Sequence, residues 1–167
     1  LQKPATSGNV YHYKQWALEV DGVGGAKVDP LWAGPGTVKV LIVGSDKGPT
    51  QEDVVERCAA HIEELRPIGA TVTVESAEGL DITVAATVLL DNTTTKTAVQ
   101  AEFTRKLIEY LNGIAFEKYE ILYNRISFML LDISGVIDYT SLTVNGGTEN
   151  ITIAANQVPI LESAVIV

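Results

Sequence analysis

The sequence is poor in the residues that build metal clusters and disulfide frameworks. Its 167 residues include one cysteine, Cys58, and two histidines, His12 and His61. A single cysteine excludes an internal disulfide and any multi-cysteine metal cluster. Neither histidine has a second one three to five residues away, as zinc sites commonly do. No standard zinc site can therefore be assembled from this chain.

Basic residues are also scarce. Twelve Lys and Arg stand against twenty-one Asp and Glu, which gives a net charge of −9 and a pI near 4.6. Nonspecific binding to nucleic acid needs basic side chains to displace counterions from phosphates, and a polybasic membrane contact needs them too. The acidic balance argues against both kinds of partner.

Long hydrophobic runs and targeting segments are missing. No stretch approaches the ~18 uninterrupted apolar residues of a membrane span, so we expect no membrane anchor. Leu1 to Gly8 have neither the basic nor the apolar part of a secretory signal. These absences favour a soluble, acidic, intracellular or particle-borne protein. Because the first residue is Leu rather than Met, we expect a fragment or a processed product.

Hydrophobic patterning predicts a first domain over residues 1–77 with the order α-β-β-α-β. Its second helix is expected to begin at a capping box formed by Thr50 and Asp53 and to end at Pro67. The other expected elements are a helix over 9–20 and strands over 26–32, 37–43 and 70–75.

A second domain is expected over residues 78–167 with the order β-α-α-β-β. A long strand over 82–90 precedes a helix that Asn112-Gly113 is expected to cap at its C-terminus. The remaining expected elements are a helix, or a strand that turns into one, over 119–133 and β segments over 136–144, 150–154 and 158–167. The fold class is therefore α+β, with two small domains, each a short mixed or antiparallel sheet packed against one or two helices.

Cys58 and His61 lie three residues apart on the second predicted helix and could face the same way. A catalytic Cys–His pair needs an exposed thiolate, whereas Cys58 lies among the apolar residues Val54, Val55 and Ile62. Free cysteine behaves mainly as a small buried apolar group. We therefore expect a packed core cysteine.

None of the glycine-rich stretches has nucleotide-binding spacing. In Gly22-Val23-Gly24-Gly25-Ala26-Lys27, Lys27 stands where a dinucleotide fingerprint requires its third glycine. In Gly34-Pro35-Gly36, proline removes an N–H that a phosphate cradle would use. Both stretches are expected to form tight turns.

Carboxylates are plentiful on the second predicted helix, but their pattern is that of a solvated face. Glu52 and Asp53 lie in the first turn, where the helix dipole favours negative charge. Paired acids can serve acid–base catalysis, yet no Gly-x-Ser-x-Gly nucleophile motif occurs in the chain. The sequence thus predicts no catalytic, cofactor-binding or metal-binding residue.

The order of several motifs in the first half is more specific than any one of them. The ordered segments are Gly8-Asn9, Trp16-Ala17, Gly22-Val23-Gly24, Trp32, Gly34-Pro35-Gly36-Thr37-Val38 and Arg66-Pro67-Ile68-Gly69-Ala70. This order resembles the carboxy-terminal part of the phage baseplate J-like protein family, of the XkdT type found in Gram-positive phages and prophages. The resemblance is strong over 8–75 and looser over 80–167, where Ser134-Gly135-Val136-Ile137-Asp138 and a later Asn-Ile segment agree.

The resemblance implies a structural role and no enzymatic one. Members of this family resemble wedge components that encircle the hub of a contractile tail and transmit its rearrangement on host contact. The implied location is the virion tail baseplate, and the host cytoplasm during assembly. The implied partners are other wedge and hub proteins, with self-association, and no cofactor is expected. An amino-terminal region that this sequence lacks is expected in the full protein.

The resemblance assigns a set of residues to turns and chain reversal, and the protein-contact role suggests candidate interface residues. The turn residues are Gly22, Gly24, Gly34, Pro35, Gly36, Arg66, Pro67 and Gly69. The candidate interface residues are Tyr13, Trp16 and Trp32 from the aromatic N-terminal region and Val165, Ile166 and Val167 from an apolar tail that could pair as an edge strand. For Trp16, the alternative is that it anchors the first helix to the first sheet.

Two alternative functions stay open. The same architecture could serve a contractile injection device that is not a phage, such as a tailocin. The chain could instead be a small acidic ligand-binding module or enzyme, which would require a pocket that gathers His12 or His61 with two carboxylates.

Overall fold

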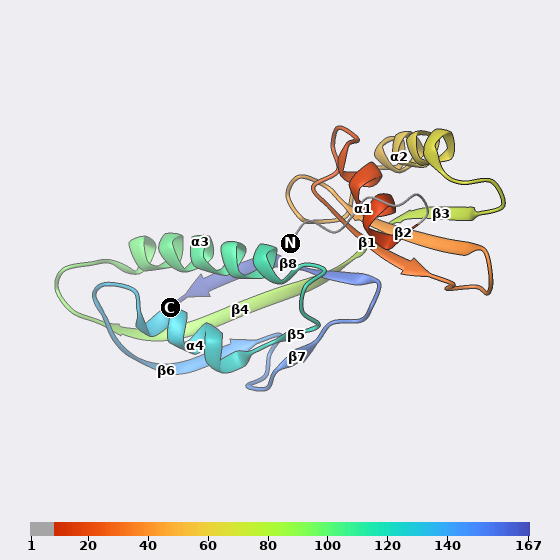
Figure 1. Cartoon of the computed structure of the whole chain (residues 1–167). Coiled ribbons are helices and arrows are strands. Elements are labelled where there is room, and N and C mark those ends of the chain that lie inside the picture. The colour runs from red at the N-terminus through yellow and green to blue at the C-terminus, as the bar shows by residue number, and fades with distance from the viewer. Residues whose placement is uncertain (1–8) are drawn as a thin grey trace. The chain divides into compact units, whose positions relative to one another are not determined.

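A computed structural model describes residues 9–167 and shows two units, each with helices packed on a small sheet (Figure 1). Contacts divide the chain into Leu1–Gly79 and Leu80–Val167. The α+β class with two small domains is confirmed, whereas the boundary expected after residue 77 stays a prediction. Leu1 to Gly8 lie outside the described residues. Two expectations therefore concern residues that are not described: the place of Gly8 in the family motif and the absence of a secretory signal.

The first unit is a three-stranded mixed sheet with two helices on one face. Strand β2 is central, antiparallel to β1 and parallel to β3. The elements are α1 (Val10–Leu18), β1 (Gly25–Pro30), β2 (Thr37–Val43), α2 (Glu52–Leu65) and β3 (Thr71–Ser76). This is the expected order α-β-β-α-β. Strand β1 ends at Pro30, two residues earlier than expected, so Trp32 lies in the loop that follows it.

The core of this unit explains why both helices share a face. Val40 and Ile42 alternate on β2 and contact buried residues of α1 and α2. The rings of Tyr13 and Trp16 meet edge to face, with centroids 5.2 Å apart. Such aromatic pairs contribute beyond the area they bury, so α1 is held to the sheet by its own aromatic residues.

Helix α2 does not begin with the expected capping box. Its N-cap is Gln51, whose side chain makes no capping hydrogen bond. The backbone N–H of Thr50 instead donates to the Ser76 hydroxyl over 2.9 Å. This tertiary bond ties the segment before α2 to the end of β3 and leaves Thr50 outside the helix.

The second unit is built around a three-stranded sheet of order β6-β4-β8. Strand β4 is antiparallel to β6. The N–H of Val167 donates to Ala86 and the N–H of Val88 donates to Val167, which is the bonding pattern of a parallel pair. The elements are β4 (Glu78–Leu90), α3 (Lys96–Ile114), β5 (Glu120–Ile121), α4 (Tyr123–Leu131), β6 (Val136–Val144), β7 (Ile151–Thr152) and β8 (Gln157–Ile166).

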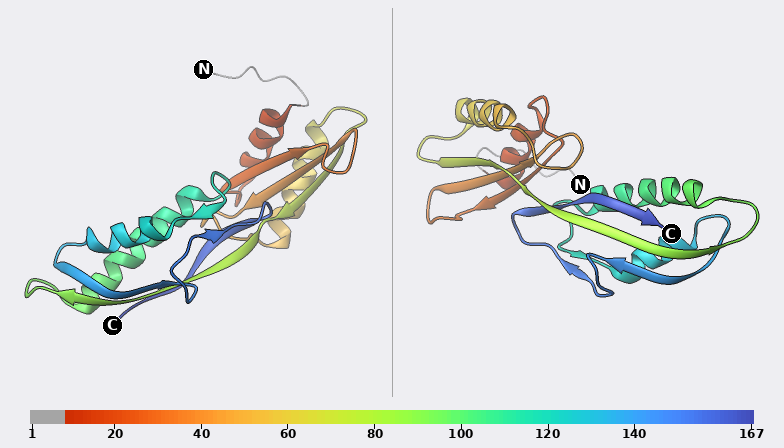
Figure 2. Two further views of the ribbon diagram at one scale, coloured as in Figure 1. Left: turned by 90° about the horizontal axis from the view of Figure 1, so that it is seen from below. Right: turned by 180° about the vertical axis from the view of Figure 1, so that it is seen from behind.

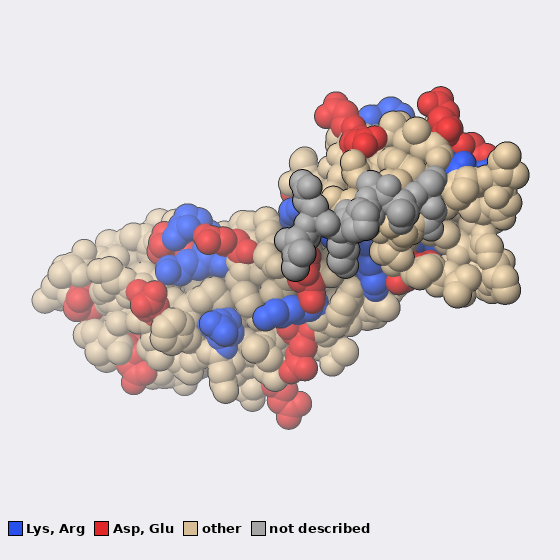
Figure 3. All heavy atoms as spheres, in the orientation of Figure 1, with Lys and Arg blue, Asp and Glu red and all other residues tan. Residues whose placement is uncertain are grey.

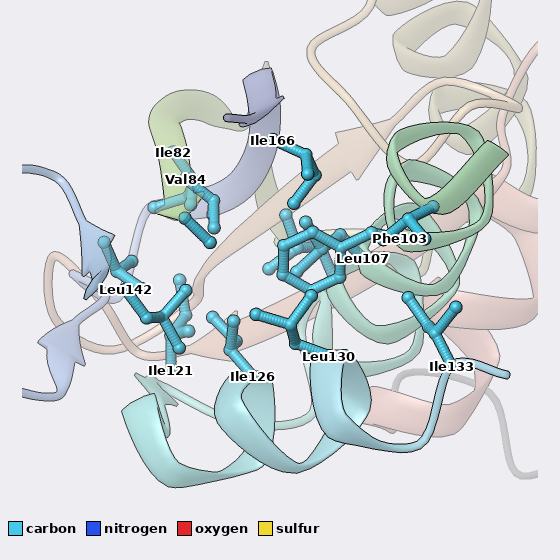
Figure 4. Close-up of a cluster of buried hydrophobic side chains, with 14 of the residues drawn as sticks. Ile82, Val84, Phe103, Leu107, Ile121, Ile126, Leu130, Ile133, Leu142 and Ile166 are labelled. Carbon is cyan, nitrogen blue, oxygen red and sulfur yellow. The ribbon is translucent and has the colours of Figure 1, made fainter. Parts of the chain in front are cut away.

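Helices α3 and α4 lie side by side on one face of this sheet (Figure 2). Their inward side chains meet those of the strands in one core, where labelled residues of α3, α4 and the sheet point toward one another (Figure 4). Phe103, Leu107 and Leu130 are fully buried there. Of the two alternatives for residues 119–133, the structure shows the strand that leads into a helix.

Helix α3 runs past the expected cap at Asn112-Gly113. Both residues are helical, the helix ends at Ile114, and Ala115 is the C-cap. Ile114 is 6% exposed and belongs to the core. Because burial of this side chain keeps Ile114 in the helix, the helix does not end in a left-handed cap at Gly113. The positive φ angle is found at Phe116 instead.

Replacing Thr95 with alanine is expected to lower the free energy of unfolding by about 1 kcal/mol. The Thr95 hydroxyl accepts a hydrogen bond from the N–H of Ala98 over 3.2 Å, and alanine would leave this N–H without that acceptor. Urea denaturation followed by circular dichroism measures the change. Thr97→Ala, at an exposed position in the first turn, should change stability little. An equal loss in both variants would contradict the capping role.

Candidate functional site

Two of the aromatic residues proposed for an interface lie in the core of the first unit. Tyr13 is 2% exposed and Trp16 is 9% exposed. Both rings pack α1 on the sheet and leave little area for a partner, and their assignment to an interface stays a prediction. The alternative, that Trp16 anchors the first helix to the first sheet, is the one that the structure shows.

Trp32 remains at the surface, in the loop between β1 and β2. Its side chain is 47% exposed, and the neighbouring Leu31, which has a φ of 59°, is 64% exposed. The ammonium group of Lys39 lies 5.0 Å from the centre of the Trp32 ring and 2.8 Å from a carboxylate oxygen of Glu75. The ring is thus held in place by a cation–π contact, and its role in an interface stays a prediction.

The C-terminal candidates are divided between the two faces of β8. Val165 and Val167 are about half exposed, whereas Ile166 is 7% exposed and contacts the core. The N–H of Ile166 donates to the side-chain oxygen of Gln100 on α3 over 3.0 Å. Ile166 therefore uses its side chain and its N–H for contacts within the unit, and its assignment to an interface stays a prediction.

Several of the residues assigned to turns lie in turns or bends between helices and strands. Gly22, Gly34, Gly36 and Gly69 have positive φ angles, and Pro35 lies between the second and third of them. Gly24 is different, because it allows a close approach of two backbones: a Cβ atom there would lie 2.2 Å from the carbonyl oxygen of Gly44.

Arg66 and Pro67 end helix α2. The guanidinium group of Arg66 donates to both carboxylate oxygens of Glu63 over 2.6 Å and to the carbonyl of Pro67 over 3.2 Å. These bonds fold the Arg66 side chain back over the last turn. The hydrogen bonds to Glu63 raise the pKa of Arg66 and lower the pKa of Glu63. Both residues stay charged at the end of the helix.

Cys58 and His61 do not form a catalytic pair. Cys58 is fully buried, and burial raises the pKa of its thiol to about 11. His61 lies at the surface, where its Nε2 is 2.8 Å from a carboxylate oxygen of Glu19 and links α2 to the residue after α1. The expectation of a packed core cysteine is confirmed by this geometry.

Native Cys58 is expected to resist labelling by a maleimide at pH 8. With a pKa of about 11, only about one thiol in a thousand is ionised at that pH. Labelling in urea should be about 100-fold faster or more, since the unfolded thiol ionises near pH 9 and is accessible. The raised pKa also means that Cys58 favours folding below pH 9 and loses this contribution as pH rises toward 11. Equal rates with and without urea, measured by mass spectrometry, would contradict burial.

His12 is also part of the packing of α1. Its ring stacks on Trp16 with centroids 5.0 Å apart. Within residues 9–167, no group of three His, Cys, Asp or Glu side chains is placed to hold a metal ion. No helix in the same range is long and apolar enough to cross a membrane.

A hollow of the second unit is a groove between α3 and the β5–α4 segment, which we call the α3–α4 groove. It has a volume of about 660 Å³, an apolar part formed by Tyr110, Ile114, Leu122 and Met129, and a polar part that includes Lys118 and Arg125. The Tyr110 hydroxyl accepts a hydrogen bond from the N–H of Leu122 over 3.2 Å. This bond connects α3 to the start of α4 across the groove.

The groove concentrates basic residues of an acidic chain. Arg105, Lys106, Lys118 and Arg125 line it, against the carboxylates of Glu109 and Glu120. In Figure 3 the Lys and Arg atoms of this unit gather over α3 and α4. This site could not be predicted from the sequence, because these cations come from three segments whose proximity depends on the packing of α4 beside α3. One signal was available in the sequence. Residues 119–133 contain more hydrophobic side chains than a helix with one buried face requires, which indicates that some of them are exposed.

Two family models match the chain, one for each unit. Residues 5–76 match the baseplate J-like central domain, and residues 82–167 match the baseplate J-like protein C-terminal domain. Together these matches cover nearly all of the sequence.

Curated relatives agree with these matches. The chain is 33% identical over 166 residues to the phage-like element PBSX protein XkdT of Bacillus subtilis strain 168, and 35% identical over 166 residues to the protein YqbT of the same strain. Each alignment covers 95% of this chain and 48% of the relative. The chain therefore spans about half the length of the curated relatives it matches. Baseplate protein gp47 of Escherichia phage Mu is 38% identical over 90 residues, which are 52% of this chain and 24% of gp47.

A solved structure shares the fold. A chain of the anti-feeding prophage (AFP) baseplate, determined by cryo-EM with 6-fold symmetrisation, superposes with a TM-score of 0.65 over 92% of this chain and 37% of that chain. The identity between the two is 14%, so the likeness shows the fold alone. With both units matched by their own family models, the chain belongs to the baseplate J-like family and carries its central and C-terminal domains.

Proposed function

We propose that the protein is a structural component of the baseplate of a contractile phage or prophage tail and acts through protein–protein contacts, not as an enzyme. Membership of the baseplate J-like family over both units carries this proposal. The proposal includes a role as a wedge component that transmits the rearrangement of the tail on host contact. The expected partners are other wedge and hub proteins, and the expected places are the virion baseplate and, during assembly, the host cytoplasm.

The surface of the chain supports a role in protein contacts. Large apolar side chains are exposed on both units, among them Trp32, Ile68 and Phe128. Exposed apolar residues that gather into patches commonly mark protein–protein contacts. The histidines support the proposal in another way: His12 stacks on Trp16 in the first unit, and His61 faces the single carboxylate of Glu19. Among residues 9–167, neither histidine belongs to a group of three His, Cys, Asp or Glu side chains placed to hold a metal ion.

Deletion of the coding region for residues 9–167 from the phage or prophage that encodes them tests the proposal. We expect host lysates without assembled contractile tails by electron microscopy, and recovery of tails when the intact gene is supplied in trans. Mass spectrometry of purified tails should detect the protein in the particle. Normal tails after the deletion would contradict the structural role.

A tailocin or another contractile injection device is the second candidate. The fold that this chain shares with a chain of the anti-feeding prophage baseplate supports this second candidate. The neighbouring genes distinguish the two, since capsid and terminase genes beside the gene for this protein would indicate a phage and their absence would indicate a device without a head.

A further inference from the structure

We propose that the α3–α4 groove of one copy of this chain binds the C-terminal end of α2 of a second copy, together with the loop residue Ile68. We call this second surface the α2 tip and define it as Glu63, Glu64, Leu65 and Ile68. The proposal rests on the proposed protein-contact function and deepens it, because it names one contact and both of its surfaces.

Four cations line the groove, and two of them make no ion pair among residues 9–167. Arg105 is paired with Glu102 and Glu109 at 2.7 and 3.1 Å, and Lys106 lies 3.6 Å from Asp132. Lys118 and Arg125 are exposed, and neither has an ion pair among residues 9–167. The carboxylate of Glu120 also lines the groove, but it accepts a hydrogen bond from Asn150 over 2.7 Å and forms no ion pair with either cation. Two unpaired cations beside one groove favour a partner with carboxylates.

The same surface is also apolar. Beside Arg125, helix α4 exposes Leu122 and Phe128, which are 40% and 64% exposed. Together with Tyr110 and Met129 they make a surface that would gain from being covered. A small anion alone would leave these side chains in water. The surface therefore fits a protein segment that brings apolar and acidic side chains together.

The α2 tip has this composition. Glu64 is exposed and has no ion pair among the described residues, while Glu63 is bound by Arg66. Leu65 is 40% exposed, and Ile68, in the loop between α2 and β3, is fully exposed at 103%. An isoleucine on a loop near the unpaired carboxylate of Glu64 is complementary to an apolar groove with unpaired cations at its edge.

The rest of the acidic surface of α2 lacks the apolar part. Glu52 and Glu56 are exposed on the first half of the helix, where Ala59 and Ala60 are the exposed apolar neighbours. Alanine offers little area to an apolar groove. The α2 tip is thus the better match, and Glu56 provides a control position on the same helix.

A contact between two different surfaces is a head-to-tail contact, so each copy can use its groove and its tip at the same time. Association should therefore grow with concentration, to a dimer if the two contacts of a pair close on each other and beyond a dimer if they do not. Because the surfaces are small and charged, we expect a weak contact that high salt weakens further.

Sedimentation velocity over a concentration series, at low and high salt, tests this with the 167-residue chain. The wild-type sedimentation coefficient should rise with concentration at low salt. The groove variant Lys118→Glu/Arg125→Glu should associate about tenfold more weakly or not at all. Lys14→Glu/Lys96→Glu, which makes the same change of charge at exposed positions outside the groove, should associate like the wild type.

The tip variant Glu64→Lys/Ile68→Ser should lose association, whereas Glu56→Lys should keep it. A mixture of the groove variant and the tip variant should associate again, because it contains one intact tip and one intact groove. Circular dichroism of each variant shows whether it is folded, and all these residues are exposed, so their replacement should leave the folds intact.

A wild-type chain that stays monomeric over the whole series would overturn the proposal. So would equal losses in the groove variant and in Lys14→Glu/Lys96→Glu, or a mixture that does not associate. If the chain is monomeric and the groove variant instead fails to bind another baseplate protein, the occupant is an acidic segment of that protein and not a second copy. None of these results changes the outcome of the deletion experiment, so the two proposals can fail separately.

Discussion

Replacing Phe103 with alanine is expected to lower the free energy of unfolding of the second unit by about 3–5 kcal/mol, the usual range for a buried phenylalanine. The Phe103 side chain is fully buried on α3 and belongs to the core that joins α3, α4 and the sheet. Alanine would remove most of the ring and leave a cavity that the surrounding helices and strands can only partly fill. Urea denaturation followed by far-ultraviolet circular dichroism measures the loss.

Phe128→Ala is the matched control for this variant. It makes the same replacement on the neighbouring helix α4, at a side chain that is 64% exposed, and should change stability by about 0.5 kcal/mol or less. Trp16 and Trp32 are the only tryptophans of the chain and both lie in the first unit, so their fluorescence reports on that unit alone. A loss in Phe128→Ala as large as in Phe103→Ala would contradict the assignment of the core.

Gly24→Ala is expected to destabilise the first unit by about 3 kcal/mol, at the upper end of the cost of overpacking. A Cβ atom at this position would lie 2.2 Å from the carbonyl oxygen of Gly44 and 2.7 Å from the Cα of Ser45. The obstacle is backbone, which cannot rotate away as a side chain can. Moving the two backbone segments apart would also stretch the hydrogen bond from the Gly24 N–H to the carbonyl of Val43, which is 2.9 Å long. Tryptophan fluorescence in a urea titration measures this change.

Gly113→Ala is the contrasting variant. Gly113 lies inside helix α3, and a Cβ atom there would meet no atom within 4 Å beyond its chain neighbours and the backbone of its own helix. Because alanine is a better helix former than glycine, this replacement should stabilise the protein by up to about 1 kcal/mol. Opposite signs for the two replacements would show that close approach, and not glycine as such, determines the effect at Gly24. A stable Gly24→Ala variant would contradict the tight packing of these two segments.

Most elements of the fold could be predicted because their signals are local. Strand β2, Thr37–Val43, is a β-branched run bounded by glycine, and helix α2 has apolar residues at helical spacing before Pro67. The errors concern positions where a distant contact competes with a local preference. Thr50 has the spacing of a cap, but its N–H is taken by Ser76. Gly113 could end a helix, but burial of Ile114 extends it.

The candidate surfaces were harder to predict than the fold. An apolar residue such as Tyr13 or Trp16 is equally suited to a core and to an interface, and only the packing of α1 on its sheet decides between the two. The α3–α4 groove depends on Lys106, Lys118 and Arg125 coming together from separate elements. Nothing in their spacing along the chain indicates this, because the path from α3 through β5 to α4 sets their distances.

The parallel pairing of β4 with the end of β8 bears on how the protein is made. Strand β4 is the first strand of the second unit and β8 is the last, so the ribosome must release almost the entire unit before the two can meet. The sheet of the first unit, by contrast, is complete once residues 25–76 have emerged. During synthesis, the edge of β4 that later pairs with β8 therefore stays unpaired until β8 has emerged. Unpaired strand edges of this kind can pair with other chains and cause aggregation. A chain that ends before β8 would therefore contain a folded first unit joined to a second unit that is prone to aggregate.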